Sequence, residues 1–384
     1  MFTVSERTRV SGAALCLAGC LVGKPQPPTA AAKTSFRIGL CSEAPLRLEA
    51  RPGASQTRGC VVTFTQRWSD PATIEWAKTT QAERRYLVYV PTNLPSRPAP
   101  VVFVFPGATC NAEAAALYNT HTRFEALADR DGFIVVYGNG LPTAGHSGNE
   151  PPMRKGGFLA GCWAEHTGEG VDVTYVRLIV DQLATELKID RARIYATGIS
   201  QGGGMAFQLA LEAPDLVAAI APVAGVPFAP SGEWLRSCHP NPGYERVSIA
   251  MLAATADPFI PYAPGSSLKI PEARFPGMEE TRNAWLSALN LTGPPAVDGF
   301  PDNVKGDSYE RQTGLTSSTI ERQRYPVGRD GQELWYYKAE GMGHAWPNPE
   351  QVWSGMWETL GKTNQDIDFA DQAWEFFQRH AKRK

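Results

Sequence analysis

A serine framed by glycines stands between an apolar strand pattern and an apolar helix pattern. Residues 198–202 read Gly-Ile-Ser-Gln-Gly, with a β-branched and aromatic run before them and the apolar run 205–211 after them. This context predicts a nucleophile elbow at Ser200, where Gly198 and Gly202 leave room for a tight turn and a helix N-terminus favours developing negative charge. The alternative is a glycine-rich turn in which Ser200 only caps the helix.

A serine hydroxyl is a weak nucleophile near neutral pH and needs a base, which a carboxylate in turn orients. The histidines that follow Ser200 are His239, His344 and His380. His239 precedes any suitable acid, and His380 lies in a charged terminal helix, where we expect it to be solvated. His344 lies in the glycine-framed loop 341–347 after a strand pattern, so it is the expected base; the alternative is a histidine that only packs in this loop.

The acid of such a site follows a strand and comes before the histidine in chain order. Asp257 follows the strand pattern 247–252 and precedes a proline, so it is the expected acid. The alternative is an aspartate that only starts a turn. Asp366 and Asp368 come after His344 and are therefore in the wrong order.

A tetrahedral oxyanion needs two backbone N–H donors. Gln201, directly after the expected nucleophile, should supply one of them. The other should come from the loop after the strand pattern 101–105, with Ala108 as the first candidate and Thr109 as the next.

Strand and helix patterns alternate along the body of the chain. This order predicts an α/β fold of the α/β-hydrolase type, with a mostly parallel central sheet, helices on both faces and no large lid domain. The expected strands are 86–91, 101–105, 133–137, 194–196, 218–222, 247–252 and 333–337, and the expected helices are 112–129, 173–187, 205–211, 272–289 and 369–380.

The bulk composition fits one large globular catalytic domain. The chain has 384 residues, of which 43% are hydrophobic and 20% charged, and its formal net charge is −2. This near-neutral balance gives no support for nucleic-acid binding. No Cys/His spacing indicates a zinc site, and we expect no metal.

The first residues have the pattern of an export signal. Two arginines precede the apolar run 13–22, which is too short to span a bilayer and suits a signal peptide. Cys20 ends a sequence similar to a bacterial lipobox, in which the cysteine is lipidated. A lipid on Cys20 would be the only membrane contact that we expect. The alternative is ordinary signal-peptide cleavage near residues 30–32. We therefore expect a leader and Pro/Ala-rich tether over 1–35, a catalytic domain over 36–384, and a location that is extracellular or in the cell envelope.

Five cysteines remain outside the leader, which agrees with an oxidising compartment. They allow at most two disulfides, and buried free thiols are the alternative. The sequence leaves the pairing open among Cys41, Cys60, Cys110, Cys162 and Cys238.

With these motifs in place, the chain resembles the family of secreted esterases that groups poly(3-hydroxybutyrate) depolymerases with feruloyl and acetylxylan esterases. The resemblance covers about 86–380 and rests on 89–91, 101–107, 132–137, 162–163, the elbow, 256–262, 343–347 and 374–377. It implies the same triad, Ser200, Asp257 and His344, and action on acyl esters without a cofactor. The chain departs from the family at Pro106, where His is usual, and at Gln201, where the depolymerases tend to have Ala.

Aromatic side chains could bind the acyl or sugar part of an ester, because rings stack on both. The candidates are Trp163, Tyr262 and Trp346, each with ordinary loop packing as the alternative. We therefore expect a serine carboxylester hydrolase acting on feruloyl or acetyl esters of polysaccharides or on related small esters. The alternatives are a hydroxyalkanoate oligomer depolymerase, an acyltransferase with the same triad, and a binding protein on an inactive hydrolase fold.

Overall fold

The computed structural model describes residues 59–69, 71, 74, 80–92, 94–108, 111–142, 161–162, 170–227, 242–269, 271, 274–301, 318–349 and 357–382. The leader 1–35, with Cys20, lies outside these residues, so export and lipid attachment stay predictions. The same holds for the disulfides, because Cys41, Cys110 and Cys238 and the side chains of Cys60 and Cys162 also lie outside them.

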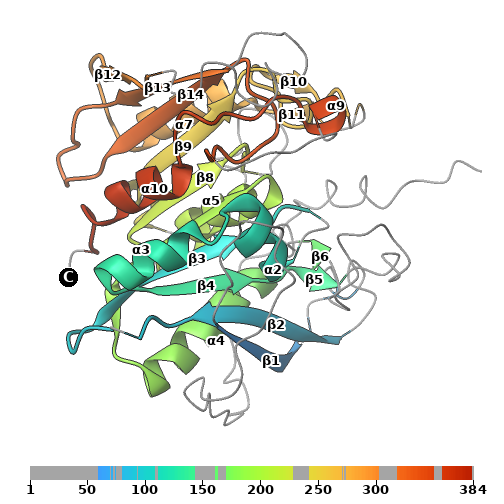
Figure 1. The fold of residues 1–384 in the computed structure, drawn as a ribbon, viewed down its shortest axis with the longest axis vertical. Helices are drawn as coiled ribbons and strands as arrows, with labels where there is room; N and C mark the ends of the chain where they lie inside the picture. Colours follow the sequence, from blue (N-terminus) through green and yellow to red (C-terminus); the bar gives the residue numbers. More distant parts are fainter. Residues whose placement is uncertain are drawn as a thin grey trace, which may run out of the picture.

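A twisted ten-stranded sheet forms the middle of the molecule (Figure 1). The central strands run parallel, and antiparallel pairs close both edges, which confirms the mostly parallel sheet. In spatial order the strands are β1 (Cys60–Arg67), β2 (Gln81–Tyr89), β4 (Ile134–Gly138), β3 (Ala99–Phe105), β7 (Ile189–Ile199), β8 (Ala219–Val223), β9 (Ser248–Ala254), β14 (Leu334–Glu340), β13 (Thr319–Arg324) and β12 (Ala296–Gly299).

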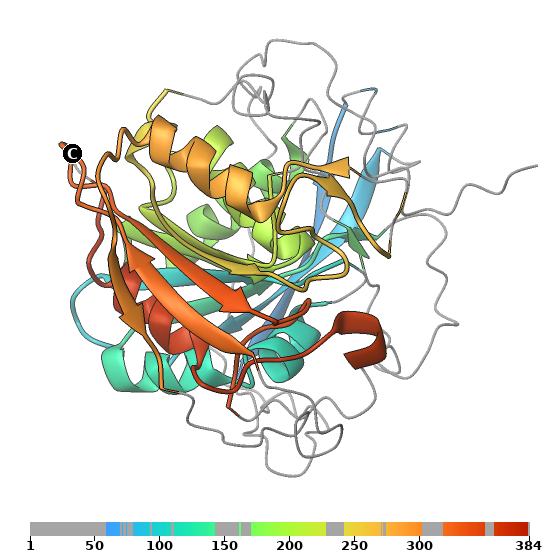
Figure 2. The same cartoon turned by 90° about the horizontal axis from the view of Figure 1, so that it is seen from above.

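Helices cover both faces of this sheet, as Figure 2 shows from above. One face carries α3 (Arg123–Asp131) and α10 (Phe369–Phe377); the other carries α4 (Val171–Glu186), α5 (Gln201–Glu212) and α7 (Met278–Ala288). Strand β3 is buried throughout and divides its side chains between the two layers. Val101, Phe103 and Phe105 pack with α4 and α5, whereas Val102 and Val104 pack with α3 and α10. The period of two in a strand thus builds two hydrophobic cores from one apolar run.

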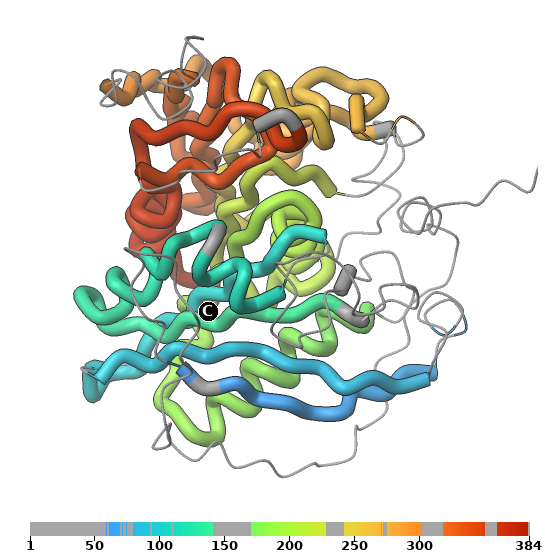
Figure 3. The backbone as a smooth tube through the Cα atoms, turned by 45° about the vertical axis from the view of Figure 1, so that its right-hand side comes forward, coloured from blue at the N-terminus to red at the C-terminus, as the bar shows by residue number. Residues whose placement is uncertain are grey.

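Figure 3 follows the backbone from the blue strands at one edge of the sheet to the orange and red segments at the other. Short elements fill the connections: α2 (Ala112–Ala114), the π-helix η2 (Ala115–Asn119), β5 (Leu141–Pro142), β6 (Gly161–Cys162), the 3₁₀ helix η4 (Tyr244–Arg246), β10 (Gly265–Ser266), β11 (Arg274–Phe275) and α9 (Trp357–Leu360). Across the described ranges, no helix is both long and apolar enough to cross a membrane. The expected lack of a large lid domain stays a prediction, because residues 143–160 and 302–317 are not described.

The helix expected over 112–129 is interrupted, which corrects that expectation. His121 and Thr122 have φ values of 48° and 56° and lie between η2 and α3. These left-handed residues end the first helical stretch, and the Thr120 N–H bonds to the Ala115 carbonyl at 3.0 Å, in the wider spacing of a π-helix. The chain therefore turns before α3 begins at Arg123.

Two other expectations are also wrong in part. The helix expected from residue 272 starts only at Met278, after Gly277, whose φ of 84° is not helical. His380 is buried rather than solvated, with 8% of its surface exposed, and burial lowers its pKa to about 4. A charged neighbourhood in the sequence did not indicate that the end of α10 packs inward.

Helix α3 carries a buried carboxyl group toward the sheet. Glu125 is buried, and the Tyr137 hydroxyl donates a hydrogen bond of 2.7 Å to its Oε2 atom. Burial raises the pKa of Glu125 from 4.5 to about 7, against the opposing effect of this hydrogen bond. Since the raised pKa favours the protonated form in the folded protein, this group stabilises the fold fully below about pH 4.5, and the stabilisation is lost as the pH rises toward 7.

We expect Glu125→Gln to remove the decrease in stability that the ionisation of Glu125 causes. An amide keeps an oxygen for the Tyr137 hydroxyl and does not ionise, so the free energy of unfolding should no longer fall between about pH 4.5 and 7, a fall on the order of 2–3 kcal/mol. Urea unfolding of the wild type and of Glu125→Gln, at about pH 5 and at about pH 8, measures the free energy of unfolding. The control is Glu83→Gln, an exposed residue of β2. An equal pH dependence in wild type and Glu125→Gln would contradict this account.

Candidate active site

Ser200 lies in the turn between β7 and α5, in a backbone conformation that non-glycine residues rarely adopt. Its φ is 59° and its ψ is −122°, outside both the helical and the strand regions. The Ser200 N–H bonds to the Val223 carbonyl at 2.9 Å, and the Ser200 carbonyl accepts from Gly204 at 3.0 Å. These bonds hold the strained residue in place, and such strain is typical of functional turns. The predicted strand–turn–helix context of this serine is confirmed.

Two glycines allow this turn to form against β3. A β-carbon on Gly198 would lie 2.5 Å from the carbonyl oxygen of Phe105, and one on Gly202 would lie 2.1 Å from the same atom. Neither distance is sterically possible without movement of the backbone. Glycine is therefore required at both positions, for the reason that the sequence suggested.

The loop after β3 lies against the serine. A β-carbon on Gly107 would lie 3.3 Å from the β-carbon of Ser200, so the main chains meet closely there. Ala108 follows directly and is half-buried, while Gln201 is the first residue of α5. Both segments expected to donate N–H groups thus lie next to Ser200. Thr109, the second candidate, lies outside the described residues.

Asp257 and His344 form a direct hydrogen bond. His344 Nδ1 lies 2.7 Å from Asp257 Oδ2, and both residues are buried. The other oxygen of the carboxylate, Oδ1, accepts from the backbone N–H groups of Phe259 at 2.8 Å and Ile260 at 2.9 Å. A carboxylate held in this way orients the imidazole and favours the tautomer with its proton on Nδ1, which leaves Nε2 able to accept one.

The three residues lie at the carboxyl ends of the parallel strands, which we call the carboxyl edge of the sheet. Ser200, Asp257 and His344 follow β7, β9 and β14, which run parallel, and parallel strands end at the same edge. Backbone hydrogen bonds connect the loops at this edge, from Ala224 N–H to the Leu252 carbonyl and from Ala256 N–H to the Met342 carbonyl, both at 3.0 Å. The structure therefore brings Asp257 and His344 into contact and places Ser200 at the carboxyl end of the same parallel strands.

A segment that the sequence did not indicate supports the histidine loop from outside. The Gly343 N–H bonds to the Lys362 carbonyl at 2.8 Å, and the His344 N–H bonds to the Leu360 carbonyl at 2.5 Å. A β-carbon on Gly343 would lie 2.2 Å from the Leu360 oxygen, so this crossing also needs glycine. The main chain that leads into His344 is thus held by residues 360–362.

The expectation that Trp346 lines the substrate site is corrected. Its indole is 1% exposed and packs edge to face against Phe124 and Phe369, with ring centroids 6.4 and 5.5 Å apart. It therefore lies in the hydrophobic core rather than at a surface open to a ligand.

The remaining aromatic candidates differ in their position. Trp163 lies outside the described residues. Tyr262 is half-buried, and its hydroxyl donates to Glu279 of α7 at 3.4 Å. Phe259, which the sequence analysis missed, is half-buried with its ring centroid 5.0 Å from the His344 ring. Its place two residues after Asp257 was the available signal. Among the described residues, no cluster of three or more His, Cys, Asp or Glu side chains could hold a metal ion.

We expect Gly202→Ala to disrupt the elbow, because the new methyl group would overlap the Phe105 carbonyl. The free energy of unfolding should fall by about 1–3 kcal/mol or more, and a fluorophosphonate probe should no longer label Ser200. The control is Gly299→Ala on β12, where no atom lies within 4 Å of the added carbon. Its unfolding free energy should change by less than about 0.5 kcal/mol. Equal stability and equal labelling of the two variants would disprove the steric requirement.

Comparison with known proteins agrees with this geometry. Residues 84–238 match the family model described as Esterase PHB depolymerase. The chain is 24% identical over 300 residues to feruloyl esterase B of Neurospora crassa, across 70% of this chain and 85% of that protein. It is 31% identical over 287 residues to poly(3-hydroxyalkanoate) depolymerase C of Paucimonas lemoignei, across 73% of this chain and 63% of that protein.

A solved structure shows the same fold. The acetyl xylan esterase from Aspergillus awamori superposes with a TM-score of 0.52 at 16% identity, covering 84% of this chain and 100% of that one. The parallel sheet, the serine elbow and these matches lead to one conclusion. The chain has the α/β-hydrolase fold, its residues 84–238 are similar to the Esterase PHB depolymerase family, and its relatives indicate a carboxylic ester hydrolase.

Proposed function

We propose that the protein hydrolyses its ester through an acyl-enzyme on Ser200, with His344 as the base and Asp257 as the residue that orients it. The observation that carries this proposal is the hydrogen bond of 2.7 Å between His344 and a doubly held Asp257 carboxylate, at the same sheet edge as the strained Ser200. A buried carboxylate–imidazole pair beside a strained serine is the arrangement that activates a hydroxyl group.

The reaction then follows from the placement of these groups. Ser200 Oγ attacks the ester carbonyl while His344 Nε2 accepts its proton, and the alcohol leaves after taking that proton from the imidazolium. Water attacks the acyl-enzyme by the same route and releases the acid. The N–H groups of Gln201 and Ala108 stabilise the oxyanion in both steps, and one such donor is worth about 2.7–4 kcal/mol of the barrier. Asp257 stabilises the imidazolium through its hydrogen bond to His344 Nδ1.

Feruloyl or acetyl esters of polysaccharides are the proposed substrates. Support comes from the relatives named feruloyl esterase and acetylxylan esterase and from Phe259, whose half-buried ring beside His344 could contact an aromatic acyl group or a sugar face. The alternative is a hydroxyalkanoate oligomer, which the relative named poly(3-hydroxyalkanoate) depolymerase C favours. These substrates differ in the acyl group and share the chemistry at the carbonyl.

We expect substitution of any of the three residues to abolish turnover of a p-nitrophenyl ester. Ser200→Ala and His344→Ala should each lower kcat/KM by about 10⁴-fold or more. Asp257→Asn should lower it by about 10³–10⁴-fold, because an amide does not stabilise the required tautomer. The control is Asp330→Asn, an exposed aspartate in the turn before β14, away from the carboxyl edge. Activity near that of the wild type in Ser200→Ala would refute the assignment.

A substrate panel separates the candidate activities. We expect hydrolysis of methyl ferulate and acetylated xylan with a higher kcat/KM than of hydroxybutyrate oligomers, and faster hydrolysis than acyl transfer to added alcohols. Preference for the oligomers would favour the depolymerase, and dominant transfer would favour the acyltransferase. A wild-type protein that neither hydrolyses an ester nor reacts with a fluorophosphonate would be an inactive binding protein.

A further inference from the structure

The loop that carries His344 continues through residues 343–349, which we call the histidine strap. Beyond the imidazole, the strap reaches the start of α10. The Phe369 N–H bonds to the Pro347 carbonyl at 3.1 Å, and Asn348 Nδ2 donates to Asp368 Oδ2 at 2.9 Å. Asn348 is 1% exposed, so the donor of this bond is buried, while Asp368 is partly exposed. The far end of the strap is thus fixed to α10, a helix that is separate from the turn between β7 and α5 that carries Ser200.

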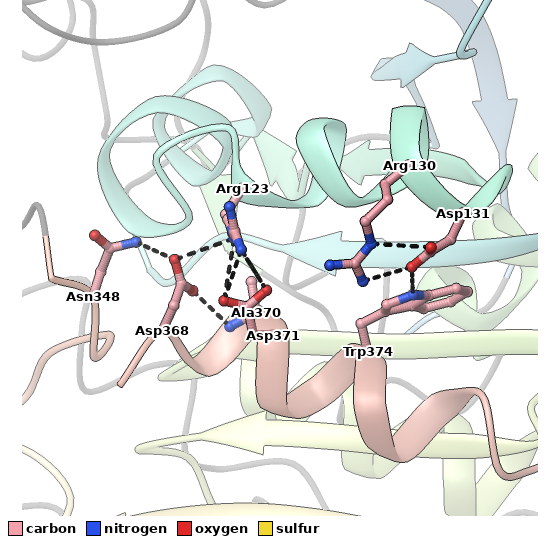
Figure 4. A network of polar contacts seen from close by, with 8 residues as sticks. All are labelled: Arg123, Arg130, Asp131, Asn348, Asp368, Ala370, Asp371 and Trp374. Carbon is pink, nitrogen blue, oxygen red and sulfur yellow. Dashed lines mark hydrogen bonds and ion pairs between the residues drawn. The ribbon is translucent and has the colours of Figure 1, made fainter. Parts of the chain in front are cut away.

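The two carboxylate oxygens of Asp368 accept hydrogen bonds from different segments of the chain. Its Oδ1 accepts the Ala370 N–H at 2.9 Å and caps α10, while its Oδ2 accepts the Asn348 amide (Figure 4). Arg123 at the start of α3 lies 3.9 Å from Oδ2 through its Nε atom. The carboxylate therefore connects the first turn of α10 to the histidine strap and faces a cation on α3.

Helix α10 is in turn held against α3 at two places, which Figure 4 shows side by side. At the end nearer the strap, Arg123 Nη2 lies 2.9 Å from Asp371 Oδ1. At the other end, Trp374 Nε1 donates to Asp131 Oδ2 at 2.5 Å. The second contact stabilises the same pair of helices without touching the strap.

The aromatic packing follows the same path. Trp346, two residues after His344, has its indole between Phe124 of α3 and Phe369 of α10. Both its side chain and the Asn348 amide are thus attached to the contact between α3 and α10. A shift of α10 along α3 would move the main chain that carries the imidazole.

We propose that Asp368 and Asn348 are positioning residues that set the place of His344 relative to Ser200. This inference rests on the proposed function, because it assigns a role to the geometry of the triad. The two residues never touch the ester; they act by limiting the movement of the strap. Their effect is large because catalysis is sensitive to distance, and a displacement of about 1 Å can cost on the order of 10²-fold in rate.

The first variant is Asp368→Asn. In the orientation that the Asn348 amide has here, the new amide presents an NH₂ group either to Asn348 Nδ2 or to the Ala370 N–H, so the observed geometry loses one of the two bonds. We expect kcat for a p-nitrophenyl ester to fall by about 10- to 100-fold with little change in KM.

The second variant exchanges the two side chains. In the double variant Asp368→Asn with Asn348→Asp, the amide at 368 can cap α10 with its oxygen and donate to the carboxylate at 348. We expect kcat to return to within about three-fold of the wild type, because the bond is rebuilt with its direction reversed. A loss of kcat caused by the substitution at 368 alone, independent of its bond to residue 348, would not be rescued in this way.

The matched control is Asp131→Ala, which removes the contact at the far end of the helix pair. We expect it to lower Tm at least as much as Asp368→Asn does and to leave kcat unchanged. Equal losses of kcat in Asp131→Ala and Asp368→Asn would attribute the effect to general loosening and overturn the proposal. A kcat of Asp368→Asn within about two-fold of an active wild type would also overturn it, as would a double variant that stays impaired.

A spectroscopic measurement keeps this test separate from the proposed function. The proton on His344 Nδ1, shared with Asp257, should give a downfield resonance in the wild type, in Asp131→Ala and in the double variant, and a weakened or shifted one in Asp368→Asn. If the wild type neither turns over esters nor reacts with a fluorophosphonate, the proposed function fails. The resonance then still tests whether Asp368 positions His344, since an unchanged signal in Asp368→Asn contradicts the positioning role.

Discussion

The carbonyl of Phe105 lies so close to Gly198 and Gly202 that neither position has room for a β-carbon. The end of β3 therefore packs directly against the turn between β7 and α5. Because the turn cannot move away, Ser200 keeps a left-handed φ of 59°, and the loop after β3 passes directly beside it. The energy stored in this conformation is offset by the buried sheet on both sides. Ser200 and the loop expected to donate to the oxyanion are thus parts of one steric arrangement.

The rest of the site follows from the parallel strands. Strands β7, β8, β9 and β14 are neighbours, so the loops after them meet at one edge and bond to each other through their main chains. Asp257 is then fixed by the N–H groups of its own loop, and it fixes His344. Backbone contacts set most of these positions, and side chains add the chemistry. This division explains how one scaffold can carry esterases with different substrates.

Much of this arrangement could be predicted from the sequence, because local patterns determine it. The glycines around Ser200, the aspartate after one strand and the histidine after a later one follow from short motifs and chain order. The break at His121 and Thr122 had no comparable signal, because neither residue is a glycine or a proline that would mark the end of a helix. Trp346 was assigned to the substrate site although it lies in the core, since an aromatic residue near a catalytic loop looks the same in either role. The contact between Arg123 and Asp371 joins residues far apart in the chain, and no local pattern indicates it.

The attachment of the histidine strap to α10 also has a consequence for the order in which the enzyme is made. A ribosome completes the elbow with Ser200 well before it reaches β14, the strap and α10. A nascent chain therefore carries the proposed nucleophile without the proposed base, and His344 gains its support only when residues 357–377 have emerged and packed on α3. Domains of this size fold largely as units during or after synthesis. If Ser200 and His344 act as proposed, the chain becomes able to cleave esters only after α10 has folded onto α3.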